Sequence, residues 1–242
     1  MLFRPRSIED WGTKFNITSE MMMKGIAELK ARGTKVHLSY GGDGLNPRGG
    51  GGLDEAPLEE SQAENLAQRI VQNVLDWDFD GIDIMALMSE PVYGNRHQSV
   101  AFHYAVIKKL RKYLPAGKTI SYTSLAAPVG KFAGDVNVWH PMEEIIAATH
   151  RYLDYVNVQV FDWNIEFAFD YLTVELGVPA EKIGWLMQDQ HFGNGLEEIM
   201  VPLVDSIRQR GLRGLSFYNA NQEHNHFRGE FLREIARYMY EQ

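Results

Sequence analysis

The residues with the clearest capacity for chemistry lie in one apolar stretch, Trp77–Pro91, which reads WDFDGIDIMALMSEP. Apolar and acidic residues alternate there, which predicts a buried strand whose polar side chains meet specific partners. A buried carboxylate is costly unless it is hydrogen-bonded or used. Asp80 and Asp83 therefore either serve acid–base or ligand chemistry, or accept hydrogen bonds from backbone amides and hold the fold together. Gly81, between them, lets a neighbouring segment approach closely.

This stretch resembles the fourth strand of glycoside hydrolase family 18, the chitinases and endo-β-N-acetylglucosaminidases. The family signature is Asp-Gly-x-Asp-x-Asp-x-Glu, and Asp80-Gly81-Ile82-Asp83 agrees with its first half. Met85 stands where the third Asp belongs, and Leu87 stands where the Glu belongs. In the family that Glu is the general acid, and the Asp beside it positions the substrate's N-acetyl group, which acts as nucleophile. Because leucine donates no proton, the resemblance implies a hydrolase scaffold without its acid.

Three other stretches carry the resemblance, which spans residues 18–240. Leu38–Gly42 resembles the Ser-x-Gly-Gly of the third strand. Gln159 and Asp162 agree with the sixth strand, where Phe161 replaces a Tyr whose hydroxyl bonds the N-acetyl carbonyl. Tyr218 keeps an aromatic ring where the eighth strand carries a Trp under the sugar. The family's polar catalytic positions are thus apolar here at three places.

The resemblance implies a catalytically inactive chitinase-like domain that binds N-acetylglucosamine-type glycans or serves as a scaffold. The residues expected to bind the glycan are Asp83, Gln159, Asp162, Tyr218 and the loop tryptophans Trp139 and Trp163. An aromatic face at the rim of such a site can stack on a sugar, whereas a buried loop anchor is the plainer interpretation of each tryptophan.

Two alternatives stay open. In one, the chain is an active endo-acting glycosidase that uses a relocated acid, with Glu90 and Asp83 as the candidate catalytic residues. Strand parity disfavours Glu90, which falls out of phase with Asp83, and its plainer interpretation is a solvated loop carboxylate. In the other, the chain is a purely structural domain of an assembly.

Other chemistry has weaker support. A metal site would need residues that follow the last strands, namely Asp189, His191, Glu223, His224 and His226. Two histidines in a loop are more often solvated, so we expect neither a metal nor another cofactor. Ser39 and Ser124 have no evident His–acid partners, which argues against a serine nucleophile. The chain has no cysteine and hence no thiol nucleophile.

Composition limits the partners. The net charge of −8 argues against nucleic acid, and we expect no membrane partner. No apolar run reaches the length of about 18 residues that a spanning helix needs. The N-terminal MLFRPRSIEDW lacks the apolar core of a signal peptide, whereas the family resemblance implies a secreted protein, so the compartment stays open.

Hydrophobic periodicity predicts six strand-then-helix units. A first helix begins at Thr18 or Ser19 and stops at Gly33. The predicted strands are 36–40, 79–87, 119–124, 155–161, 183–188 and 212–219. The predicted helices that follow them are 61–76, 95–114, 141–151, 165–177, 195–210 and 227–240.

This alternation indicates an α/β fold with a parallel sheet. The resemblance favours a (β/α)8 TIM-barrel-like fold without its first one or two strands, and an open doubly wound parallel sheet is the runner-up. We expect one domain over 1–242, a fragment of a longer chain or a domain that another chain or segment completes.

Overall fold

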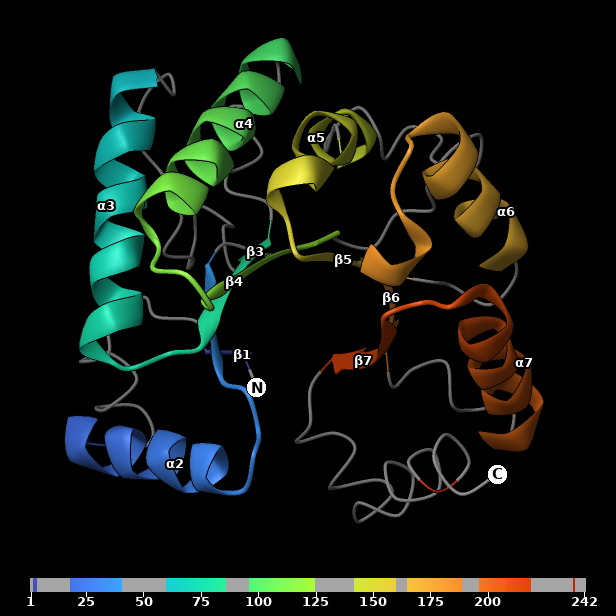
Figure 1. Ribbon diagram of the computed structural model, residues 1–242, viewed down its shortest axis with the longest axis horizontal. Coiled ribbons are helices and arrows are strands. Elements are labelled where there is room, and N and C mark those ends of the chain that lie inside the picture. Colours follow the sequence, from blue (N-terminus) through green and yellow to red (C-terminus); the bar gives the residue numbers. More distant parts are fainter. Residues whose placement is uncertain are drawn as a thin grey trace, which may run out of the picture. The chain divides into compact units, whose positions relative to one another are not determined.

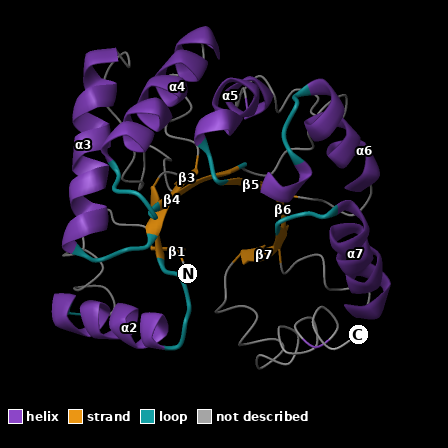
Figure 2. Cartoon of the chain, in the orientation of Figure 1, coloured by secondary structure: helices purple, strands orange, loops and turns teal. Residues whose placement is uncertain are grey.

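The computed structural model describes residues 2–3, 18–40, 60–85, 96–124, 142–159, 165–188, 196–218 and 237. They form an α/β fold in which parallel strands alternate with helices (Figure 2). The chain divides into two compact units, Met1–Leu125 with Gly134–Asp154 and Ala126–Ala133 with Tyr155–Gln242. A single domain over 1–242 stays a prediction.

The first unit is a parallel sheet whose strand order follows the chain. Its strands are β1 (Leu2–Phe3), β2 (His37–Tyr40), β3 (Gly81–Met85) and β4 (Thr119–Thr123). Its helices are α2 (Ser19–Ala31), α3 (Glu60–Asp76), α4 (Arg96–Tyr113), α5 (Met142–Thr149) and the 3₁₀ helix η4 (His150–Tyr152). Helices α3 and α4 lie side by side along one side of β3 and β4 (Figure 1).

The second unit repeats the pattern with three parallel strands, again in chain order. They are β5 (Tyr155–Gln159), β6 (Ile183–Gln188) and β7 (Gly214–Tyr218). The helical segments are α6 (Ile165–Asp170), the π-helical turn η5 (Tyr171–Glu175), the 3₁₀ turn η6 (Ala180–Lys182) and α7 (Leu196–Arg210). Among the described residues, no helix is both long and apolar enough to cross a membrane.

The predicted strands and the first six helices are confirmed, with ends that differ by a few residues. The helix predicted at 165–177 is α6 followed by a π-helical turn. The helix predicted at 227–240 lies outside the described residues except for Arg237, which is helical. A doubly wound sheet reverses its strand order at a switch point. Neither unit shows such a reversal, so the order is the one expected of a barrel.

The boundaries of helix α2 could be predicted from the sequence because capping residues lie at both of its ends. The Thr18 hydroxyl accepts a hydrogen bond from the Met21 amide at 3.2 Å and satisfies one free donor of the first turn. At the other end Gly33 adopts φ 81°, and its amide donates to the Lys30 carbonyl at 2.9 Å. A residue with a Cβ adopts this left-handed conformation reluctantly, so the glycine ends the helix.

The strands of the first unit have one apolar face and one polar face. The apolar face consists of Leu38, Ile82, Ile84, Ile120 and Tyr122, all 2% exposed or less. Helices α3 and α4 supply the matching buried residues Leu66, Ile70, Val74, Val106 and Leu110. Each such side chain stabilises the fold by about 1.5–3 kcal/mol. The core therefore lies between the sheet and its helices, and the opposite face of the strands carries His37, Ser39, Asp83, Ser121 and Thr123.

Gly81 lies in register with Thr119 on β4. A Cβ at this position would stand 2.3 Å from Thr119 Oγ1 and 2.4 Å from the Thr119 carbonyl oxygen. The same Thr119 hydroxyl lies 2.9 Å from Nε2 of His37 on β2. Since Gly81 is the register partner of both residues, this hydrogen bond passes over a residue without a side chain.

We expect Gly81→Ala to destabilise the chain by about 3 kcal/mol, because the methyl group would overlap backbone that cannot move aside. Gly25→Ala in α2 is the control: nothing lies within 4 Å of its Cβ position, and alanine should stabilise the helix by about 0.5–1 kcal/mol. Urea denaturation measures both. Equal effects of the two substitutions would contradict the close approach at Gly81.

Candidate functional site

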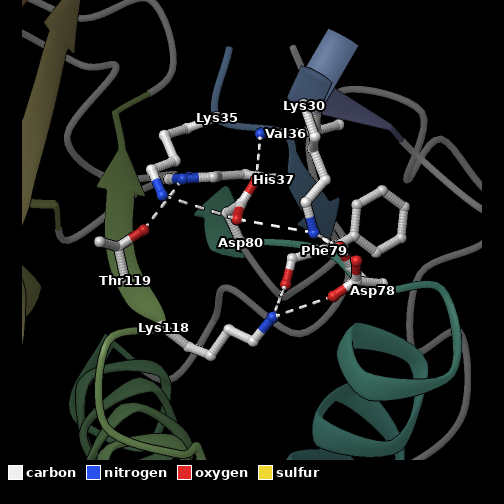
Figure 3. A network of polar contacts seen from close by, with 9 residues as sticks. All are labelled: Lys30, Lys35, Val36, His37, Asp78, Phe79, Asp80, Lys118 and Thr119. Carbon is white, nitrogen blue, oxygen red and sulfur yellow. Dashed lines mark hydrogen bonds and ion pairs between the residues drawn. The ribbon is translucent and has the colours of Figure 1, made fainter. Parts of the chain in front are cut away.

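Asp80, the first carboxylate of the β3 stretch, is used to hold β2 beside β3 (Figure 3). Its Oδ2 accepts the Val36 amide at 2.9 Å, and its own amide donates to the Val36 carbonyl at 2.7 Å. Lys30 Nζ and Lys35 Nζ each lie 3.8 Å from Oδ1. These contacts satisfy the carboxylate at the start of the strand, so its geometry agrees with a role in holding the fold together.

Asp78 and Lys118 extend this network. Lys30 binds the Asp78 carboxylate and donates to its carbonyl oxygen at 2.7 Å. Lys118 donates to the Phe79 carbonyl at 2.5 Å and lies 3.6 Å from Asp78 Oδ1. The hydrogen bond from Lys30 lowers the pKa of Asp78. This side chain is 75% exposed, so its ion pairs contribute little to stability.

Asp83 differs because it is fully buried on the polar face of β3. Ser121 Oγ and Thr123 Oγ1, both from β4, donate to its Oδ1 at 2.6 and 2.8 Å. Ser39 is its register partner on β2 and is 1% exposed. A row of hydroxyl groups thus flanks the Asp83 carboxyl group. Aliphatic residues usually fill such positions in barrels, so these polar residues are not needed for packing alone.

Met85 follows Asp83 on the same face, by the two-residue period of a strand, and is 3% exposed. At the place where the family signature has its third Asp, the chain thus carries a buried thioether side chain. A thioether sulfur is a weak acceptor and cannot position an N-acetyl group as a carboxylate does.

Of the remaining predicted site residues, two lie at strand ends and the others lie outside the described residues. Gln159 and Tyr218 are the last residues of β5 and β7. The carboxyl ends of strands are where barrels of this kind carry their sites. The candidates that lie outside the described residues are Leu87, Glu90, Trp139, Phe161, Asp162, Trp163, Asp189, His191, Glu223, His224 and His226.

Some polar partners were missed by the sequence analysis. Ser121 and Thr123 support Asp83, and in the second unit Ser216 Oγ donates to Asn157 Oδ1 at 3.1 Å. The available signal was alternation: in Thr119–Thr123, polar residues occupy every second position, as they do in Tyr155–Gln159. Alternation assigns a residue to a face but names no partner on another strand. Among the described residues, no group of three or more His, Asp or Glu could hold a metal ion.

Comparison with known proteins decides the family. The model of the glycosyl hydrolases family 18 matches residues 6–187, which is most of the chain. This chain belongs to that family. No curated protein sequence matches it. The resemblance to family 18 is therefore confirmed, while the loss of catalysis stays a prediction.

Solved structures agree on the fold. A family 18 chitinase from Pseudoalteromonas aurantia has 20% sequence identity and a TM-score of 0.66, with 91% of this chain and 82% of that chain covered. A chitinase from Bacteroides thetaiotaomicron has 11% identity and a TM-score of 0.66, covering 100% and 96%. An endo-β-N-acetylglucosaminidase from Cordyceps militaris has 15% identity and a TM-score of 0.55, covering 92% and 77%. The predicted TIM-barrel-like α/β fold is confirmed.

We expect this family 18 chain to lose stability in mild acid, because the buried His37 resists protonation in the folded state. Burial lowers the pKa of its imidazole from 6.5 to about 4. Between these values the unfolded chain binds a proton that the folded chain does not, so stability falls as the pH falls from 6.5 to 4 and then levels off. The full effect is about 3 kcal/mol. Urea denaturation at pH 7 and pH 4 should show a smaller loss in His37→Gln, and an equal loss in both proteins would exclude this role.

Thr123→Val should cost about 1–3 kcal/mol, because it removes a donor to the buried Asp83 carboxylate and changes the shape of the side chain little. Thr173→Val is the matched control, since the Thr173 hydroxyl donates to the Phe169 carbonyl in a less buried helix. Thr173→Val should lower the free energy of unfolding by less than about 1 kcal/mol. Thermal unfolding of both variants tests whether the Asp83 contacts matter; a larger loss in the control would show that they do not.

Proposed function

We propose that this family 18 chain binds N-acetylglucosamine-type glycans and does not hydrolyse them. The observation that carries the proposal is the buried Met85 on β3, in register with Thr123, at the third Asp of the family signature. The signature's acid position two residues later holds Leu87. The strand thus keeps Asp83 but carries no carboxylate at residue 85, and the sequence has none at residue 87.

The chemistry explains why this loss matters. Removal of a general acid typically slows a reaction by about 10²–10⁴-fold. In substrate-assisted glycosidases the N-acetyl group is the nucleophile, so no second enzyme carboxylate takes over the attack. Phe161 also lacks the hydroxyl that the family uses to bind the N-acetyl carbonyl. Three substitutions in one reaction's machinery favour a site that is no longer used for hydrolysis.

Binding needs fewer groups than catalysis, and several side chains suited to binding a sugar are present. Asp83 of the family signature is present, and two hydroxyls donate to its Oδ1. The other proposed contacts are Gln159, Asp162, Tyr218, Trp139 and Trp163. Amides and carboxylates suit sugar hydroxyls, and aromatic faces suit the apolar face of a sugar ring. The solved relatives, which are chitinases and an endo-β-N-acetylglucosaminidase, support N-acetylglucosamine as the sugar class.

The test combines turnover with binding. A fluorogenic chitobioside should show no turnover above that of a heat-denatured sample, whereas calorimetric titration with chitohexaose should give saturable binding. Trp139→Ala and Trp163→Ala should each weaken binding at least about tenfold, which corresponds to about 1.4 kcal/mol. Trp77→Ala is the control, since Trp77 lies in the turn between α3 and β3, and it should leave the affinity unchanged.

The other outcomes decide between the alternatives. Turnover that Glu90→Gln abolishes would make the chain an active glycosidase with a relocated acid and would overturn the proposal. Absence of both turnover and binding would identify a structural domain. Asp83→Asn keeps an oxygen for Ser121 and Thr123 to donate to, so this variant should fold and show whether the negative charge contributes to glycan affinity.

A further inference from the structure

The first unit carries a groove on its outer side, away from the polar face of the strands. It has a volume of 760 Å³ and lies between α3, α4 and η4. Its polar lining residues are Glu64, Tyr104, Lys108, Lys109, Arg111, Lys112, Tyr113 and Tyr152. Four of these are basic and one is acidic, which is unusual for the surface of a chain with a net charge of −8.

Ion pairs fix the walls of this groove. Lys109 and Tyr113 on α4 both bind the Glu64 carboxylate on α3 and lower its pKa. Arg111 donates from Nε to the Tyr152 carbonyl at 2.9 Å and from Nη2 to Asp154 at 2.6 Å. These contacts join α4 to α3 on one side and to η4 on the other. Lys109 and Arg111 thus use their charges within the protein, in ion pairs that position the groove walls.

Three further cations are not compensated in this way. Lys108, Lys112 and Arg151 are exposed, and no carboxylate of the described residues forms an ion pair with them. Aromatic rings hold them at the groove: Lys108 Nζ lies 5.5 Å from the Tyr104 ring centre, and Lys112 Nζ lies 5.2 Å from that of Tyr113. Lys108 and Lys112 are one helical turn apart, so they face the same side.

Two phenol groups add hydrogen-bonding capacity. The hydroxyls of Tyr104 and Tyr152 lie 3.3 Å apart, and Arg151 Nη2 donates to the Tyr104 hydroxyl at 3.4 Å. These hydrogen bonds, the one with Tyr152 first, lower the pKa of Tyr104. The Arg151 guanidinium also lies 5.0 Å from the Tyr152 ring centre. Cations and hydroxyl groups thus meet at one end of the groove.

We propose that this groove is a second binding site, which takes an oligosaccharide carrying sulfate or carboxylate groups. Lys108 and Lys112 line the groove and Arg151 lies against two of its tyrosines, and within the described part of the chain none of the three has a carboxylate partner. These cations complement a series of anionic groups, and the tyrosine hydroxyls complement the sugar hydroxyls between them. The inference does not depend on the proposed function, since it uses no residue of β3 and needs no catalysis.

Nucleic acid fits the groove less well. Binding of single strands relies on aromatic faces on which successive bases stack. Here Tyr104 and Tyr152 meet edge to face at 71°, and the nearby cations cover ring faces of both. Recognition by charge and hydroxyl groups remains, which is the chemistry of an anionic sugar chain.

Calorimetric titration of the whole chain tests the proposal with four probes. A heparin hexasaccharide represents the sulfated class and hexagalacturonate represents the carboxylated class, while chitohexaose is the neutral sugar and an oligothymidylate of matched charge represents nucleic acid. We expect one of the anionic sugars to bind with an affinity that falls as salt rises, and the sugar that binds identifies the anionic group.

Lys108→Glu with Lys112→Glu should weaken that binding at least about tenfold, because two counterion-releasing contacts are lost. Lys24→Glu with Arg32→Glu, at exposed positions in and just after α2, changes the net charge equally and should weaken it less than about twofold. Chitohexaose affinity should be unchanged in both variants, which separates this site from the β3 site.

Circular dichroism establishes that both double variants are folded. Absence of binding by both anionic sugars would overturn the proposal, as would equal losses in the two double variants. Oligothymidylate binding as tight as that of the sugars would also overturn it and would assign the groove to nucleic acid.

Discussion

A buried carboxylate constrains much of the first unit. Asp83 lies in the middle of β3 without exposure to solvent, and a polar group in such a place is costly unless it is hydrogen-bonded. Ser121 and Thr123 meet this need from β4, and they can do so only if the two strands keep their register. That face of the sheet carries mostly polar groups, so most of the apolar core forms on the other face, against α3 and α4.

Hydrogen bonds on strand faces explain two of the strand glycines, Gly81 and Gly184. In the first unit His37 and Thr119 approach each other across Gly81. In the second unit Asn157 lies beside Gly184, where a Cβ would stand 3.0 Å from Asn157 Oδ1, and Ser216 donates to that oxygen. Polar side chains on a strand face need room for a hydrogen bond over the strand between them, and a residue without a side chain provides it. Both units therefore use glycine for the same steric reason.

The two proposed sites draw on different residues of the first unit and differ in their chemistry. At β3, Met85 stands in place of a carboxylate while Asp83 is kept and hydrogen-bonded, and we therefore proposed binding of a neutral sugar without cleavage. On the helical side, α4 gathers cations whose charges are only partly compensated by Glu64 and Asp154. The net charge of −8 did not predict this basic groove, because a total over the chain says nothing about where its charges lie.

The sequence by itself determined the elements and the family. Alternating hydrophobicity is local information, so six strands, a helix start at Thr18 or Ser19 and its stop at Gly33 could be predicted, and the β3 motif pointed to the glycosidase family. The loss of its acid stays a prediction. Only the tertiary structure decided how the polar residues are paired. Asp80 and Asp83 look alike in the sequence, yet one bonds the Val36 amide and the other two hydroxyls about 40 residues away. The groove likewise forms only where η4 reaches α4, because side-chain partners are set by strand register and helix packing, which no short stretch encodes.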